Sequence, residues 1–127
     1  MNSFLLVFLG AGLGGVLRHG MSVMCVRWFG AGFPWGTFAV NVSGSLVMGL
    51  LAGWLALRAG AEWSQDARLF LMVGILGGYT TFSAFSLDAV LLWERGAAFE
   101  AGGYVLASVV LSIAALAAGL GLVRAVS

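Results

Sequence analysis

Four long apolar runs, separated by short polar seams, limit the fold of this chain more than any other feature. A helix that crosses the hydrocarbon core of a bilayer needs about 20 mostly apolar residues. Only 9% of the residues are charged, whereas a soluble domain carries about 25%. The chain is therefore predicted to be an all-α membrane protein, one four-helix domain over residues 1–127 with spans near 3–28, 35–58, 68–93 and 100–124.

The seams are too short for a second domain, so any activity must lie within the bilayer, in contact with membrane lipid. Charged residues gather at the seams because burying them in hydrocarbon is costly. The formal net charge of +1 gives no reason to expect a nucleic-acid partner. Since no nucleophile, base or metal cluster can be assembled from these residues, an enzyme is the least expected class.

The arginines at the two membrane faces are nearly balanced. An even number of spans puts both termini on one side, together with Arg58, Arg68 and Arg124, and leaves Arg27 and Arg95 on the other. This bias is too weak to fix one orientation by the positive-inside rule. Insertion in both orientations, and with it an antiparallel homodimer, follows as a hypothesis.

Two polar stripes with i, i+4, i+8 spacing run along the second and fourth spans: Thr37, Asn41 and Ser45, and Tyr104, Ser108 and Ser112. This spacing places each set on one helix face. A buried carboxamide needs hydrogen-bond partners, but it can find them simply by holding helices together. Serine in a membrane helix often bonds to its own helix carbonyl. The stripes therefore indicate either a polar pathway or ordinary packing.

The segment GGYTTFSAFS, residues 77–86, interrupts the third span. Gly77 and Gly78 each weaken a helix by roughly 1 kcal/mol relative to alanine. The hydroxyls of Thr80, Thr81 and Ser83 can bond the backbone groups that a break would free. A break at mid-membrane is therefore predicted, and such breaks occur where they line a cavity or lie buried in protein.

Aromatic and basic side chains near this segment have two interpretations each. Phe82 and Phe85 share one helix face, and their electropositive ring edges would suit a small anion, although a phenylalanine pair more often packs in a core. Arg18 interrupts the first span, where an arginine marks a pathway or extends its charge to the headgroups.

Glycines in the first two spans indicate close helix packing. Residues 10–15, GAGLGG, fit a dinucleotide-binding pattern, but that site needs a preceding strand and an acidic residue about 20 positions later. The first acidic residue is Glu62. Small residues four apart, such as Gly10 with Gly14 and Gly49 with Gly53, instead let membrane helices approach each other.

Three motifs together, GLGGVLR (12–18), GTFAVNVSGS (36–45) and GILGGYTTFSAFS (74–86), resemble the Fluc family of small bacterial fluoride channels, also called CrcB. The resemblance covers essentially the whole chain. It implies an antiparallel dual-topology homodimer in the bacterial cytoplasmic (inner) membrane. Two pores, each lined by both subunits, would export fluoride passively and confer fluoride resistance.

The resemblance also implies roles for residues. The fluoride pore would be formed by Arg18, Thr37, Asn41, Thr81, Phe82, Ser83, Phe85, Tyr104, Ser108 and Ser112. A structural sodium ion on the dimer axis would be held by the backbone carbonyls of Gly77 and Thr80, beside a third helix broken at TTFS. The chain departs from the family at Ala84, where threonine is typical, and at Asp88, where glutamate is common.

Other kinds of membrane protein remain open from the sequence. A fluoride/proton exchanger or another small-solute transporter is the main alternative, and a non-transporting assembly subunit is a second. Proton coupling needs a carboxylate at mid-membrane, and Asp88, near the end of its span, is the only candidate. Passive flow is therefore the favoured mechanism.

Overall fold

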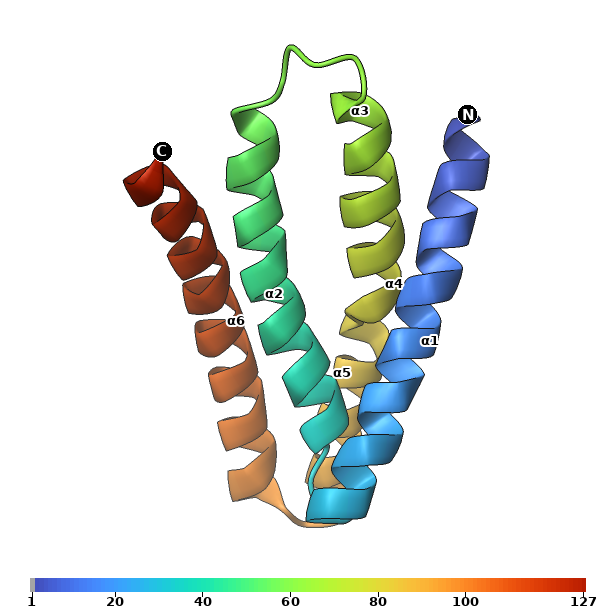
Figure 1. Cartoon of the computed structure of the whole chain (residues 1–127). Helices are drawn as coiled ribbons and strands as arrows, with labels where there is room; N and C mark the ends of the chain where they lie inside the picture. The colour runs from blue at the N-terminus through green and yellow to red at the C-terminus, as the bar shows by residue number, and fades with distance from the viewer. Residues whose placement is uncertain (1) are drawn as a thin grey trace.

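Four helical spans make up most of the protein in the computed structural model, which describes residues 2–127 (Figure 1). The first, second and fourth are α1 (Ser3–Phe29), α2 (Trp35–Ala56) and α6 (Ala98–Val126). The third is composite: α3 (Ser64–Ala67), η1 (Arg68–Leu76), α4 (Gly77–Tyr79) and α5 (Phe82–Glu94). All four are long and apolar enough to cross a membrane, which confirms the predicted all-helical membrane protein.

The two ends of the bundle carry different segments. Both termini lie at the same end as the loop between α2 and α3, while the α1–α2 and α5–α6 connections lie at the other end (Figure 1). The third span starts at Ser64, four residues before the expected start, and Asp66 in its first turn is favourable at the positive end of the helix dipole. Gly30 caps α1, and Gly96 follows Arg95, the C-cap of α5. Their φ of 80° and 84° are values that glycine adopts without steric cost.

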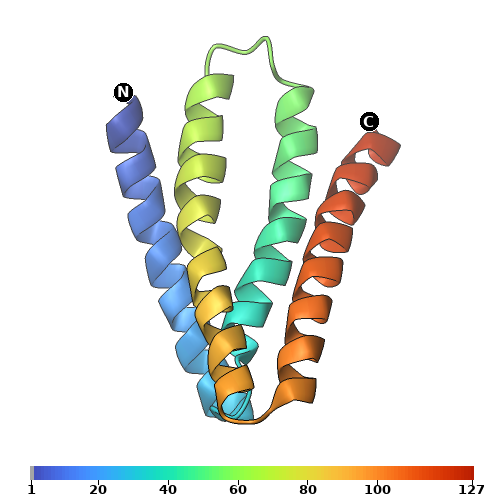
Figure 2. The same cartoon turned by 180° about the vertical axis from the view of Figure 1, so that it is seen from behind.

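The spans pack in two pairs. The first helix, α1, lies along η1 and α4, and α2 lies along α6 (Figure 2). Glycines allow the close approach: a Cβ added at Gly10 would lie 2.5 Å from the Phe70 carbonyl oxygen, and one at Gly49 would lie 3.0 Å from the Leu120 nitrogen. This confirms that these glycines serve helix packing, and residues 10–15 lie inside α1 rather than after a strand.

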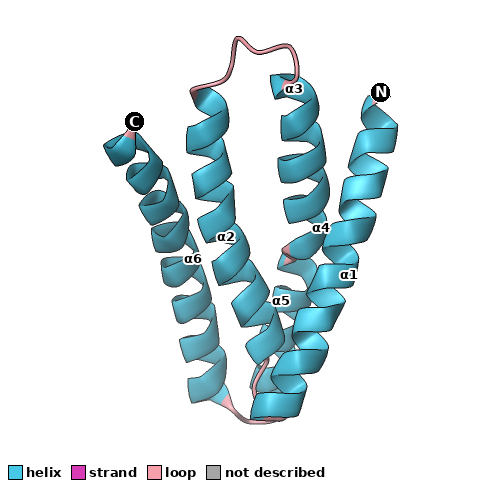
Figure 3. Ribbon diagram, viewed as in Figure 1, coloured by secondary structure: helices cyan, strands magenta, loops and turns pink. Residues whose placement is uncertain are grey.

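The third span changes its helical form before it is interrupted. Residues 68–76 form a π-helix, a wide i→i+5 winding that is rare outside functional regions. Thr80 then adopts φ −88° and ψ 158°, and Thr81 adopts φ −153° and ψ 119°. These two extended residues separate α4 from α5 (Figure 3).

Few residues of each span are buried inside the single chain. In the apolar 18-residue window of each span, between 11% and 28% of the residues are buried. The largest fully buried side chains are Tyr104, Leu55 and Val40. Most apolar side chains therefore face outward, which suits a protein whose surroundings are hydrocarbon rather than water.

Candidate functional site

The Asn41 side chain of α2 makes two hydrogen bonds to the interrupted backbone of the third span, and this pair of bonds is here called the clasp. Its Nδ2 donates to the Thr81 carbonyl at 3.0 Å, and its Oδ1 accepts from the Thr81 N–H at 2.8 Å. Buried backbone groups outside a helix need such partners. A carboxamide has two N–H donors, so one donor of Asn41 is left after the clasp is made.

The threonine hydroxyls bond two further backbone groups at the interruption. Thr80 Oγ1 donates to the Leu76 carbonyl at 2.8 Å, and Thr81 Oγ1 accepts from the Ala84 N–H at 3.2 Å as the N-cap of α5. Capping side chains of this kind stabilise a new helix start. Ser83 Oγ lies 3.4 Å from Thr81 Oγ1, on the exposed side of α5.

Backbone carbonyls before the interruption lose their helical donors as a result, and those of Gly77 and Thr80 are among them. In a continuous α-helix, the N–H of residue i bonds the carbonyl of residue i−4. The Thr81 N–H, which would bond Gly77, bonds Asn41 instead, and the Ala84 N–H, which would bond Thr80, bonds Thr81 Oγ1. The carbonyls of Gly77 and Thr80 are therefore free of the helical partner that each would otherwise have.

Arg18 reaches the same interruption from α1. Its Nε donates to the Gly78 carbonyl at 3.1 Å, so the charged head bonds protein backbone instead of extending to the membrane surface. The guanidinium thereby fixes the turn that precedes the two extended threonines.

A pocket of about 370 Å³, here called the central pocket, opens beside the interruption between the third span, α2 and α6. Its polar lining residues are Asn41, Ser45, Thr80, Thr81, Ser108 and Ser112. Phe82 and Phe85 contribute aromatic walls. None of the lining residues is charged, so the pocket offers a ligand neutral groups: hydroxyls, an amide, backbone groups and aromatic rings. Arg18, Thr37 and Ser83 do not line it.

The hydroxyls of Ser108 and Ser112 stand apart from the other serines. Both Oγ atoms are buried and make no hydrogen bond within the described chain. By contrast, Ser43 Oγ donates to the Ala39 carbonyl at 2.6 Å, and Ser86 Oγ donates to the Phe82 carbonyl at 3.0 Å. A hydrogen-bond acceptor in the pocket that both serines line would relieve the cost of leaving these two hydroxyls unpaired.

The two phenylalanines lie together but differ in exposure. Their ring centroids are 5.5 Å apart. Phe85 is 8% exposed and packs against Tyr104 with a centroid distance of 5.2 Å, whereas Phe82 is 76% exposed. Core packing therefore accounts for Phe85, but it does not account for Phe82.

A second pocket of about 270 Å³, the end pocket, lies where the α1–α2 and α5–α6 connections meet, and Thr37 and Asp88 are among its lining residues. Tyr104 is fully buried, and its hydroxyl donates to Asp88 Oδ2 at 3.2 Å. The stripe on α2 is thus divided: Thr37 lines the end pocket, and Asn41 and Ser45 line the central one.

Ser45 lines the central pocket, although the pore residues that the resemblance implies do not include it; its place in the polar stripe with Asn41 is the signal that indicates it. It also gave no signal that Asp88 bonds Tyr104, because that bond joins different spans and has no local pattern.

Comparisons with known proteins agree along nearly the whole chain. The family model described as CrcB-like protein, Camphor Resistance (CrcB), matches residues 5–120. A protein of Rhodopseudomonas palustris (strain BisB5) named fluoride-specific ion channel FluC is 61% identical over 98% of this chain and 99% of its own length. Fluoride-specific ion channel FluC 2 of Nitrobacter hamburgensis is 58% identical, over 96% and 97% of the two chains. A protein of Hyphomonas neptunium with the name fluoride-specific ion channel FluC is 54% identical, over 98% and 97%. The chain belongs to the CrcB family.

Proposed function

We propose that this protein is a fluoride-selective ion channel, and not an enzyme, in line with the names of its relatives. The observation that carries the proposal is the pair of buried, unpartnered hydroxyls of Ser108 and Ser112, which line the central pocket with Asn41. Fluoride is small and strongly hydrated, so crossing hydrocarbon requires donors that replace its water. These O–H and N–H groups supply that replacement.

The proposed pathway follows the polar stripes. Fluoride passes from the end pocket, beside Thr37, past Tyr104 and along Ser108 and Ser112 in the central pocket. This part of α6 is about 12 Å long at about 1.5 Å per residue. The electropositive ring edges of Phe82 and Phe85 face the anion along the way. Thr81 and Ser83 add hydroxyls at the interruption, and Arg18 contributes positive charge near the Gly78 carbonyl.

We further propose that the channel is an antiparallel dual-topology homodimer with two pores. Two features of the single chain support this arrangement. The arginines are nearly balanced between the two ends, and Phe82, on the wall of the central pocket, is 76% exposed. A second copy would cover this open side and complete the pore wall.

The same assembly provides for a structural sodium ion on the dimer axis. Carbonyl oxygens are suitable ligands for a hard cation, and the carbonyls of Gly77 and Thr80 have given up their helical donors. Gly77 is exposed on the single chain, so its carbonyl is accessible to an ion shared with a partner. When bound, sodium would join the two copies. Replacing sodium by N-methylglucamine should lower the thermal stability of the assembly, and equal stability in both salts would reject this site.

The channel is proposed to reside in the bacterial cytoplasmic membrane as a multi-pass protein and to confer fluoride resistance. Hydrogen fluoride crosses membranes and dissociates inside the cell, and the negative-inside potential then drives fluoride out. Passive flow is therefore sufficient for export.

Fluoride efflux from proteoliposomes tests this function. Purified protein is reconstituted in vesicles loaded with potassium fluoride, and efflux is followed with a fluoride electrode, with chloride-loaded vesicles as the control. Uncoupled anion flow requires valinomycin to carry the compensating potassium. A fluoride/proton exchanger also moves net charge and needs the same potassium shunt, but it alone takes up protons as fluoride leaves, so a rise in acidity inside the vesicles during efflux would favour it. No efflux in either condition would leave a non-transporting assembly subunit.

A further inference from the structure

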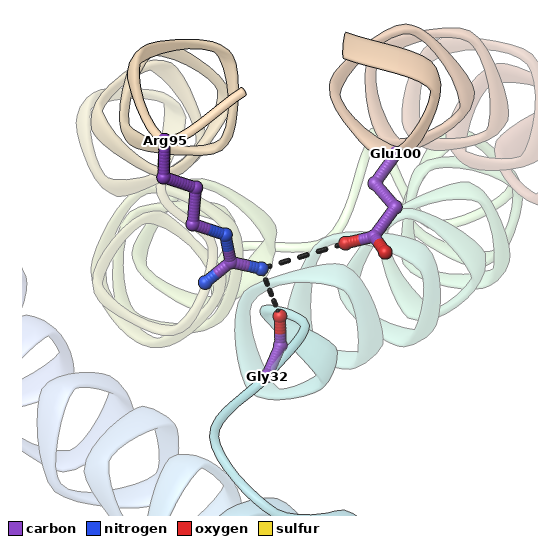
Figure 4. A network of polar contacts seen from close by, with 3 residues as sticks. All are labelled: Gly32, Arg95 and Glu100. Atoms are coloured by element: carbon purple, nitrogen blue, oxygen red, sulfur yellow. Dashed lines mark hydrogen bonds and ion pairs between the residues drawn. The ribbon is translucent and has the colours of Figure 1, made fainter. Parts of the chain in front are cut away.

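Arg95 ties together the two connections at one end of the bundle. It is the residue that caps the C-terminus of α5, and its guanidinium donates to the Gly32 carbonyl in the α1–α2 connection (Figure 4). The same nitrogen lies 3.4 Å from Glu100 Oε2 at the start of α6. One side chain therefore contacts both the α1–α2 connection and the first turn of α6.

The α1–α2 connection has few other restraints. Within the described chain, the bond from Arg95 is the only side-chain hydrogen bond made to residues 30–34. The backbone bonds there run from the Gly30 N–H to the Val26 carbonyl, from the Trp35 N–H to the Phe33 carbonyl and from the Phe38 N–H to the Pro34 carbonyl. Because residues 30–32 read Gly-Ala-Gly, the backbone itself is conformationally free. Among the described residues, Arg95 thus adds a side-chain hydrogen bond to the restraint that the packing of Phe33 gives this segment.

Phe33 links the connection to the proposed pathway. Its ring meets the Tyr104 ring edge-on, with centroids 5.4 Å apart and an interplanar angle of 87°, and it packs on Trp35 at 4.6 Å. Tyr104 has no exposed surface and donates its hydroxyl to Asp88. Since Gly32 directly precedes Phe33, the bond from Arg95 to Gly32 fixes the ring that supports Tyr104.

We propose that Arg95 is a positioning residue of the channel, which acts on Tyr104 through Gly32 and Phe33. The flux consequence rests on the proposed function, but the structural consequence does not. The ion pair between Arg95 and Glu100 contributes less. Both side chains are about half exposed, and exposed ion pairs contribute little to stability. The bond to Gly32 is the effective contact of Arg95, and the bond to Glu100 is dispensable.

Four variants separate position from charge. R95Q removes the bond to Gly32 and one positive charge, whereas R95K keeps the charge and one point donor. R27Q removes an exposed positive charge from the same end of the bundle and controls for net charge only, because Arg95 lines the end pocket and Arg27 does not; R95K is the control for charge at the pocket. E100Q breaks only the ion pair. The loss of one charge-assisted bond leads us to expect about tenfold less fluoride flux for R95Q, an intermediate loss for R95K, and wild-type flux for R27Q and E100Q.

The Y104F background tests whether Arg95 acts through Tyr104. Contacts that work through one another give non-additive effects, so R95Q should cause no further loss of flux in a Y104F protein. An equal fold-loss in both backgrounds, or equal losses for R95Q and R27Q, would overturn the proposal. If R95Q does not assemble, R95K in the two backgrounds carries the same comparison.

Hydrogen exchange provides a readout that needs no flux. In R95Q, the hydrogen-bonded amides of Gly30 and Trp35 at the two ends of the connection should exchange faster than in wild type, while E100Q leaves them unchanged. Unchanged exchange in R95Q would overturn the proposal even in an active channel. Faster exchange in a protein without fluoride flux would support the positioning role and reject only the proposed function.

Discussion

Replacing Ser108 and Ser112 by alanine removes two hydroxyl donors without removing any hydrogen bond inside the described chain. If these donors replace the water of fluoride, each contributes as a hydrogen bond to a charge, about 1.5–3 kcal/mol. At about 1.4 kcal/mol per factor of ten, each substitution should lower fluoride flux by about 10- to 100-fold. The effect on stability has the opposite direction, because the cost of burying an unpaired hydroxyl is relieved.

S43A is the matched control for these variants. Ser43 bonds the Ala39 carbonyl at 2.6 Å and lies 2.9 Å from the Tyr79 hydroxyl, and it does not line the central pocket. S43A should therefore lower the melting temperature while preserving flux per folded protein. Fluoride efflux from proteoliposomes and thermal unfolding in detergent measure the two quantities. If the S108A/S112A double variant transports fluoride like wild type, or if it is markedly destabilised, the hydroxyls do not have the assigned role.

Three further predictions follow from the same contacts. N41A loses both bonds of the clasp on Thr81. At about 1 kcal/mol per bond, its free energy of unfolding should fall by about 2 kcal/mol, and fluoride efflux should fall with it. A denaturant titration that finds N41A as stable as wild type would contradict the role of these bonds. F82A should reduce flux and retain stability because its ring is exposed, whereas F85A should cost about 3–5 kcal/mol as a core truncation; equal melting temperatures for the two variants would reject this distinction. G14A would place a methyl group against the Ile75 carbonyl and 2.8 Å from the Tyr79 nitrogen, while the methyl group of G121A meets no atom of another described helix within 4 Å. Only G14A should therefore reduce the yield of folded protein in size-exclusion chromatography. Equal yields for the two variants would show that the close approach at Gly14 is not required.

Much of the fold could be predicted because it depends on local pattern. Four apolar runs separated by charged seams predict the four spans, and glycines spaced four apart predict close helix packing, although not which helices meet. The segment around Thr80 could be singled out because glycines and hydroxyls weaken a helix there. The π-helix at 68–76 was not predicted, since a uniformly apolar run does not distinguish one winding from another.

The candidate site was less predictable because its contacts join distant segments. The bond of Arg95 to Gly32 and that of Tyr104 to Asp88 leave no periodic trace in the sequence. Helix spacing put Phe82 and Phe85 on one face, but only the packing of α6 decides which ring is buried. Helix spacing also placed Thr37 on the same face as Asn41, although the two residues line different pockets.

The central claim is that neutral donors conduct fluoride without coupling to protons, and the reversal potential in a planar bilayer tests it most directly. With a tenfold fluoride gradient and equal chloride on both sides, the current should reverse at about 59 mV in magnitude, whether or not a pH gradient is imposed. A reversal at zero voltage, or one that moves with the pH gradient, would contradict the account.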